Sequence, residues 1–321
     1  MTTREIKTKL IGKEELFKIL ALGEAAQLPV LLIGSPGVAK TQAILDYAKG
    51  YHAQQGSKIV GDNTFIIELD EGTKSSEIKG RPDMQQLLEH KKYQVDAPIA
   101  DAEFILINEV DKGTSAIRNA MLSIMRERVL FFGKEKRPCK WKIFAASCNI
   151  MSGDEEDLPL WDRFVIKSKI NRIPVIDVPL MWTSGEKIIH INIPSKEEIE
   201  ATPLNPHKIG QFVNLVYENL TDRTISYIPL LVSCAKIVWG VSETEAIAKV
   251  CEILVPSKLN SLIAAIEDKR VTSIKNSIVN LGGMTDSGLM MKTLKNIDTE
   301  IKRIMNDPSF DQSEVQLIKE M

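Results

Sequence analysis

The chain has 321 residues, with 41 basic and 43 acidic side chains and a formal net charge of −2. This balance excludes a global field that would attract nucleic acid or an anionic membrane, and the length suits one large α/β domain plus a smaller one. The apolar runs are far shorter than the roughly 20 residues that cross a bilayer, and the first residues lack a signal-peptide pattern. The four cysteines form no CxxC pair, so neither a zinc site nor a disulfide framework is expected. We therefore expect a cytoplasmic protein.

The first strong pattern is an apolar run at 28–33, followed by a glycine-containing turn and a helical pattern. The turn reads Gly34-Ser35-Pro36-Gly37-Val38-Ala39-Lys40-Thr41, with Ala39 where glycine is usual. Backbone N–H groups of such a turn hold phosphate oxygens, the lysine brings a cation to the terminal phosphates, and the threonine hydroxyl ligates Mg²⁺. The helix that starts near Lys40 adds the positive end of its dipole. The segment therefore predicts a site for ATP and Mg²⁺.

Five short apolar runs precede residue 171, and three of them are nearly continuous, as expected of strands buried on both faces. They lie at 30–33, 65–69, 104–107, 142–146 and 165–170. Helix-like patterns separate them, for example at 115–128. Strands that alternate with helices predict an α/β fold with a parallel sheet sandwiched by helices. The stretch 128–136 breaks this order and predicts a hairpin inserted before the fourth strand.

Two of these strands end in polar side chains. Asn108 and Glu109 end the third, and Asn149 ends the fourth. ATP hydrolysis requires a carboxylate near the attacking water, and Glu109 can act as that base. Asn108 stands where an aspartate is expected; its amide can hydrogen-bond a metal-bound water but brings no negative charge. Asn149 can orient the attacking water or the γ-phosphate, although in isolation it would be an ordinary turn residue.

An arginine precedes the last predicted strand. Arg163 lies in the segment Leu158-Pro159-Leu160-Trp161-Asp162-Arg163-Phe164. A side chain there cannot readily reach the nucleotide of its own chain, but it can reach the γ-phosphate of a neighbouring subunit and stabilise transition-state charge. The alternative is a surface salt bridge with Asp162.

Helical patterns dominate after about residue 195, where Ser195-Lys196-Glu197-Glu198 forms a capping box. We expect a nucleotide-binding α/β domain at 1–194, a helical lid domain at 195–256 and a helical C-terminal extension at 257–321. In the extension, Leu294, Ile297, Ile301 and Ile304 form an amphipathic stripe. The stripe predicts packing on the helical domain, with an oligomer or partner contact as the alternative.

The order of phosphate loop, acidic strand end, polar strand end and arginine resembles the AAA+ ATPases, and within them the MoxR family. That family often has alanine before the lysine of the phosphate loop, as this chain has at Ala39. Five further segments resemble family motifs: the adenine-side motif at 10–13, the insert of the second helix at 73–80, the Walker B strand at 107–112, the following helix at 115–122 and the start of the lid helix at 220–223. The match covers about residues 8 to 250.

The resemblance implies a role for each matching position. The phosphate-loop residues are those at 34–41, and Ile11 and Gly12 contact the adenine. Thr41 and Asn108 serve the metal, and Glu109 is the catalytic carboxylate. Asn149 is sensor 1, Arg163 is the arginine finger supplied in trans, and Arg223 is the sensor 2 arginine supplied in cis. Pro229 departs from the pattern, because it lies inside the helix that Arg223 is expected to begin and would kink it.

The resemblance further implies a homo-oligomeric ring, expected to be a hexamer, that couples ATP hydrolysis to remodelling or maturation of a protein client. Family members commonly work with a partner that carries a von Willebrand factor A domain. The inserted loops at about 74–80 and 129–137 would face the pore or the client. Neither a membrane nor a nucleic acid is expected as a partner.

Two alternatives stay open. Asn108 favours a scaffold that binds ATP but scarcely hydrolyses it. The basic stretch at 134–140 favours a DNA-acting AAA+ motor, since a hairpin that carries lysines can contact phosphates. A solvated hairpin tip explains the same basic stretch without any nucleic acid.

Overall fold

The computed structural model describes residues 2–55, 60–82, 95–132, 135–266 and 287–305. At its centre is a parallel five-stranded sheet with the order β10-β2-β9-β6-β3. The strands are β2 (Val30–Ile33), β3 (Val60–Glu68), β6 (Phe104–Asn108), β9 (Ile143–Cys148) and β10 (Ile166–Lys169). All five predicted strands and the parallel sheet are therefore confirmed.

Helices cover both faces of the sheet because neighbouring residues of its buried strands point to opposite sides. In β6, Phe104 and Leu106 join one apolar core, and Ile105 and Ile107 join the other. The first core also contains side chains of two helices on one face, α1 (Glu14–Ala26) and α2 (Lys40–Gln54). The second contains those of α6 (Ser115–Arg126) and α7 (Leu158–Arg163).

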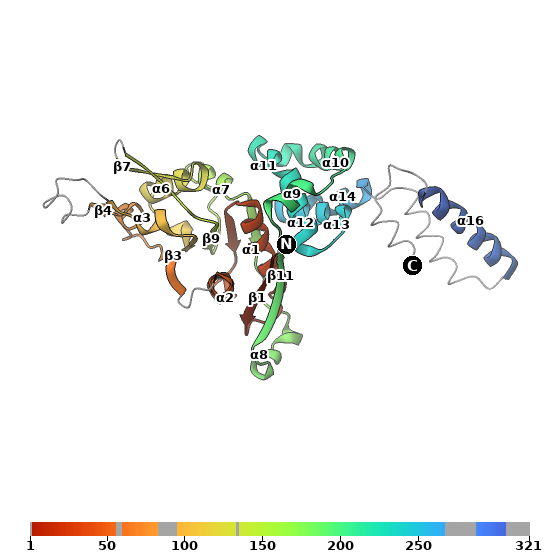
Figure 1. Ribbon diagram of the computed structural model, residues 1–321, viewed down its shortest axis with the longest axis horizontal. Coiled ribbons are helices and arrows are strands. Elements are labelled where there is room, and N and C mark those ends of the chain that lie inside the picture. Colours follow the sequence, from red (N-terminus) through yellow and green to blue (C-terminus); the bar gives the residue numbers. More distant parts are fainter. Residues whose placement is uncertain (1, 56–59, 83–94, 133–134, 267–286, 306–321) are drawn as a thin grey trace.

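The predicted hairpin is present as the antiparallel pair β7 (Val129–Phe132) and β8 (Glu135–Pro138). The segment that resembles the family's second-helix insert lies close to it. The segment at 73–80 contains α3 (Ser75–Lys79), and it is followed by β4 (Arg81–Pro82), β5 (Val95–Asp96) and α5 (Pro98–Asp101). The labels α3, β4 and β7 gather at the left end of the molecule in Figure 1, so both insertions share one end of the fold.

Two strands outside the main sheet were not predicted. β1 (Thr2–Thr8) pairs antiparallel with β11 (Lys187–Ile193), with Thr2 opposite Ile193 and Thr8 opposite Lys187. The segment before β11 contains two short helical turns, η2 (Val175–Asp177) and α8 (Leu180–Thr183). Figure 1 shows α8 at the lower tip of the molecule.

A buried ion pair ties β1 to both helices of the first core. The Arg4 guanidinium is 2% exposed and forms a two-point ion pair with Glu24 on α1, with Nη2 2.8 Å from Oε1. The Tyr47 hydroxyl of α2 donates to the same carboxylate at 2.6 Å. The guanidinium also lies over the rings of Tyr47 and Tyr51, 5.1 and 4.9 Å from their centroids. One arginine therefore fixes where the N-terminal strand packs.

The helical region that follows β11 packs on α1. Its elements are α9 (Lys196–Ala201), α10 (Pro206–Val216), η3 (Tyr217–Asn219), α11 (Asp222–Ser226), α12 (Ile228–Trp239), α13 (Glu243–Leu254), η4 (Pro256–Lys258) and α14 (Leu259–Ile266). Ser195 and Glu198 form the predicted capping box of α9. The Glu15 carboxylate of α1 accepts from Trp239 Nε1 at 2.9 Å and from Lys249 Nζ at 2.8 Å. The boundaries at 194 and 256 stay a prediction.

The expected kink at Pro229 is wrong. Instead of one helix through the proline there are two, since α11 ends at Ser226 and α12 begins at Ile228. Pro229 lies in the first turn of α12, where a residue without an N–H costs no intrahelical hydrogen bond.

The C-terminal extension is described over α16 (Ser287–Met305). Of its amphipathic stripe, Ile297 is buried and Leu294 is 45% exposed, and the side chains of Ile301 and Ile304 lie outside the described residues. Within the ranges that the structure describes, no helix is long and apolar enough to cross a membrane.

Arg4→Met should lower the free energy of unfolding by about 3–5 kcal/mol, because Glu24 would keep a buried charge without its cation. Urea denaturation measures this change. The double variant Arg4→Met/Glu24→Gln removes both charges and keeps an acceptor for Tyr47, so it should regain at least half of the loss. Glu5→Gln, at an exposed neighbour, is the control. An Arg4→Met cost no larger than that of Glu5→Gln would contradict this role of the ion pair.

Candidate functional site

The phosphate loop leaves β2 in a conformation that its sequence makes possible. The Gly34 N–H donates to the Cys148 carbonyl at 3.2 Å, and a Cβ on Gly34 would lie 2.6 Å from the Ile170 carbonyl oxygen. Gly37 and Ala39 both adopt positive φ, 82° and 67°. The left-handed conformation costs a non-glycine residue about 1 kcal/mol. The loop thus holds strain at Ala39, the N-cap of α2.

Lys40 is the first residue of α2, at the end of this loop, and it is buried. Its ammonium donates to the Gly34 and Ser35 carbonyls, the latter at 3.2 Å, and to Asn149 Oδ1 at 3.1 Å. Burial lowers the pKa of Lys40, and the nearby groups Cys148, Asp111 and Glu109 act in the opposite sense. The ammonium is therefore held where loop carbonyls and a strand-end amide meet, within reach of a phosphate in the loop.

Asn108 joins the loop to the two middle strands. Its Oδ1 atom accepts from the Thr41 hydroxyl and from the Ser147 hydroxyl, each at 3.1 Å. The residue is 7% exposed. It therefore holds Thr41 in place as an acceptor, and it does so without a negative charge.

One cavity brings most of the predicted site residues together. It has a volume of about 410 Å³, and its lining includes residues 36–41 of the loop together with Asn108, Glu109 and Asn149. It lies where β2, β6 and β9 end, which is where open parallel sheets bind ligands. Gly34 and Ser35 reach the site through the hydrogen bonds of their carbonyls with Lys40.

Glu68, Ser147 and Lys112 belong to this site and were not predicted. Glu68 and Ser147 line the cavity, and Lys112 forms an ion pair with Glu109. Glu109 itself adopts a left-handed conformation with φ of 55° at the start of η1 (Val110–Lys112). A signal for Glu68 existed, since it ends a buried strand as Asn108 does, and parallel strand ends meet at one edge of the sheet.

The donor atoms of the cavity suit a magnesium ion that arrives with its nucleotide. In the part of the chain that the structure describes, no group of three or more His, Cys, Asp and Glu side chains could hold a metal by itself. Thr41 and Asn108 supply neutral oxygen atoms, and Glu68 and Glu109 supply carboxylates. Mg²⁺ prefers oxygen ligands and is usually held by one or two protein groups plus substrate phosphates.

The adenine-side motif borders a second cavity, of about 720 Å³. Gly12, with φ of 63°, lines it together with Leu16, Ile33, Ile173 and Ile253, so α13 of the helical region forms one of its walls. Ile11 is half-buried beside Gly12 and is not among the lining residues. This cavity is more apolar than the phosphate cavity, as a base requires.

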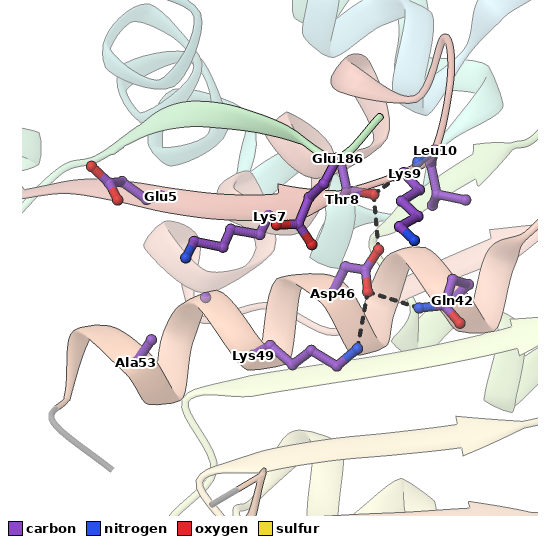
Figure 2. A pocket seen from close by; sticks show the side chains of 11 residues that line it. Glu5, Lys7, Thr8, Lys9, Leu10, Gln42, Asp46, Lys49, Ala53 and Glu186 are labelled. Atoms are coloured by element: carbon purple, nitrogen blue, oxygen red, sulfur yellow. Dashed lines mark hydrogen bonds and ion pairs between the residues drawn. The ribbon is translucent and has the colours of Figure 1, made fainter. Parts of the chain in front are cut away.

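A buried carboxylate fixes the segment that leads to this motif. Figure 2 shows Asp46 of α2 pointing toward the end of β1, where its Oδ2 atom accepts from the Thr8 hydroxyl at 2.8 Å. Its Oδ1 atom accepts from Gln42 at 2.7 Å and from Lys49 at 3.3 Å. Thr8 Oγ1 accepts from the Leu10 N–H at 3.1 Å. Asp46 thereby couples the helix of the phosphate loop to the chain just before Ile11.

The two arginines lie elsewhere. Arg163 and Arg223 do not line the phosphate cavity. Arg223 Nη1 lies 2.5 Å from Asp162 Oδ2, and Arg163 Nη1 lies 3.6 Å from the same oxygen atom. The structure therefore brings the arginine expected in cis and the arginine expected in trans together on one carboxylate, away from the phosphate loop of their own chain.

The strand order, the phosphate loop after β2 and the polar residues on neighbouring strand ends define an AAA+ type of nucleotide-binding protein. The model of the MoxR domain of MoxR-vWA-beta-propeller ternary systems matches residues 1–208. This match covers more than half of the chain, which belongs to the MoxR family of AAA+ ATPases.

Known proteins resemble this chain over parts of their length. Structural protein ORF618 of Acidianus two-tailed virus is 30% identical over 189 residues, 57% of this chain and 29% of that protein. Chaperone MoxR1 of Mycobacterium tuberculosis is 26% identical over 134 residues, 42% of this chain and 33% of that protein. The chain thus spans about a third or less of the length of these relatives. The crystal structure of a candidate ATPase from Cytophaga hutchinsonii aligns with a TM-score of 0.48 and 17% identity over 89% of this chain and 90% of that one, too low to support a conclusion.

Lys40→Ala should weaken ATP binding at least about tenfold, roughly 1.4 kcal/mol, because the loop loses its cation. Titration with a fluorescent ATP analogue measures this affinity. Lys49→Ala is the matched control on the same helix, with a side chain that is 56% exposed, and it should leave the affinity within about twofold. Equal affinities for wild type and Lys40→Ala would rule out this phosphate site.

Proposed function

We propose that this chain is an ATP hydrolase whose sites are completed at interfaces between copies in a ring, a hexamer by the family resemblance, and that hydrolysis drives remodelling of a protein client. One observation carries the proposal. Lys40, Thr41, Asn108, Glu109 and Asn149 face one cavity from three strand ends, while both arginines lie outside it. A phosphoryl-transfer site needs an arginine to stabilise transition-state charge, and a second copy of the chain can supply it.

The predicted site residues of the cavity each have a role in this mechanism. Loop N–H groups and Lys40 bind the phosphates, and Thr41 with Asn108 would hold a magnesium ion, which would neutralise phosphate charge. Glu109 takes the proton of the attacking water, and Asn149 orients the γ-phosphate or that water. Glu109 starts from an ion pair with Lys112, so this pair opens before the carboxylate reaches the water.

Arg163 and Arg223 both serve the nucleotide of the neighbouring copy. The role in trans for Arg163 follows the family resemblance, and the shared partner Asp162 supports the same role for Arg223 in place of the expected role in cis. The adenine occupies the cavity of about 720 Å³ beside Gly12. Because α13 of the helical region lines this cavity, a bound base would contact that region.

The insertions at the left end of Figure 1 form the client surface. On the hairpin, Phe131 is 37% exposed, and the Lys136 ammonium lies 5.4 Å from its ring centroid. An exposed aromatic ring beside a cation suits contact with a protein. The family model describes MoxR domains that work with a von Willebrand factor A protein, and we propose such a partner here.

The alternative of a DNA-acting motor loses support from the hairpin itself. Arg137 and Lys140 of the basic stretch form ion pairs with Asp101, the second with Nζ 3.0 Å from Oδ1. A carboxylate among these cations weakens their attraction for phosphates. The alternative of a scaffold still depends on Asn108, which places no charge beside the metal.

Mixing two inactive variants tests the shared site. Lys40→Ala lacks a working phosphate loop, and Arg163→Ala lacks the arginine that a neighbour needs, so each alone should lose at least about tenfold in turnover. In a random 1:1 mixture, about a quarter of the interfaces pair an intact loop with an intact arginine. ATP turnover of the mixture should recover toward that fraction. An inactive mixture, in subunits shown to exchange, would contradict hydrolysis at the interface.

Asn108→Asp tests the scaffold alternative. We expect the wild type to turn over ATP, and the variant to be faster by up to about tenfold, or roughly 1.4 kcal/mol in the activation free energy, since a negative charge would attract the metal. Steady-state phosphate release with magnesium measures both. A wild type without turnover that Asn108→Asp switches on would instead establish the scaffold.

A further inference from the structure

Asp162 joins two parts of the fold that carry separate arginines. It lies in the last turn of α7, in the α/β part, and accepts from the Thr221 hydroxyl at 2.7 Å and from Arg223 Nη1 at 2.5 Å, both in the helical region. Thr221 is also the N-cap of α11, where its side chain accepts from the Thr224 N–H. One carboxylate therefore fixes the start of α11 against α7.

The positive charge around Asp162 exceeds what one carboxylate neutralises. Arg163 Nη1 is 3.6 Å from Asp162 and donates to the Pro159 carbonyl at 3.3 Å, and its Nε is buried without a hydrogen-bond partner. Burial lowers the pKa of Arg163, with contributions from the like charges of Arg223 and Arg126, and Asp162 opposes them. Arg163 and Arg223 thus share one acidic partner, and Asp162 lies farther from Arg163 than from Arg223.

We propose that Asp162 is a positioning residue that holds Arg163 of α7 and Arg223 of α11 together as one receptor for the terminal phosphate bound by a second copy of this chain. This inference rests on the function proposed above. An anion that meets two guanidinium groups at once gains charge-assisted hydrogen bonds from both. Because Asp162 lies 2.5 Å from Arg223 and 3.6 Å from Arg163, the guanidinium of Arg163 is the one that a phosphate can draw away with less loss. Movement of the helical region would then shift the positions of both guanidinium groups together.

Asp162→Asn removes the charge and keeps the size of the side chain. Its own phosphate loop should bind a fluorescent ATP analogue with an affinity within about twofold of the wild type, since the loop does not contact Asp162. Turnover of the pure variant should fall at least about tenfold. Mixing it 1:1 with Lys40→Ala, which supplies an intact Asp162, Arg163 and Arg223, should restore turnover toward about a quarter of the wild-type value. Asp222→Asn, at an exposed neighbouring carboxylate, is the matched control and should leave turnover unchanged.

A structural role and a positioning role give different results. If Asp162 only held the two regions together, Asp162→Asn would weaken ATP binding and assembly, and mixing with Lys40→Ala would restore nothing. Unchanged turnover of the pure variant would also overturn the proposal. Should Asp162→Asn not fold, Asp162→Glu keeps the charge and shifts it by one methylene, and it should fold and show reduced turnover that Lys40→Ala complements. The mixture of Lys40→Ala with Arg163→Ala separates the two claims. If that mixture stays inactive, the proposed site at the interface is wrong. If it recovers turnover while the mixture with Asp162→Asn does not, only the role of Asp162 is wrong.

Discussion

The site depends on hydrogen bonds that link the ends of three parallel strands. Lys40 donates to Asn149, and Asn108 accepts from both Thr41 and Ser147, so the phosphate loop after β2 is tied to β6 and β9 by side chains. Parallel strands bring these ends to one edge of the sheet, and the buried residues on both faces of β6 keep them in register. Around this link, Ala39 holds a strained backbone, and Asp46 fixes the chain that leads to the adenine-side motif.

The cavity and the arginines divide the chemistry between two surfaces of the molecule. The cavity supplies a cation at Lys40, oxygen atoms for a metal and the carboxylate of Glu109. The second surface gathers Arg163 and Arg223 on Asp162, in contact with the helical region. This division is the basis of our proposal that hydrolysis depends on assembly, because the cavity has no arginine of its own chain among its lining residues. The helical region packs on α1 and also borders the second cavity.

The sequence was sufficient for the main sheet and the phosphate cavity because both are encoded locally. Runs of apolar residues mark strands buried on both faces, and the loop from Gly34 to Thr41 needs its residue types for its own conformation. β1 and β11 were missed because polar residues alternate along β1 and its partner strand lies 179 to 191 positions away in the sequence. The burial of Arg4 depends on Glu24 and Tyr47, which no local pattern connects to it. Asp162 and Arg223 are 61 positions apart, so their contact exists only in the folded chain. The kink at Pro229 was wrongly predicted because no local pattern marks Ile228 as the start of a new helix.

The central claim is that a triphosphate lies between two copies of this chain, bound by the loop of one and approached by the arginine of the other. A structure of the assembly with magnesium and a slowly hydrolysed ATP analogue tests this claim most directly. The account predicts phosphates against Lys40 of one copy and the Arg163 guanidinium of the next copy within hydrogen-bond distance of the γ-phosphate. Density for the analogue with Arg163 of every copy facing solvent, or a loop at Lys40 left empty at saturating analogue, would contradict it.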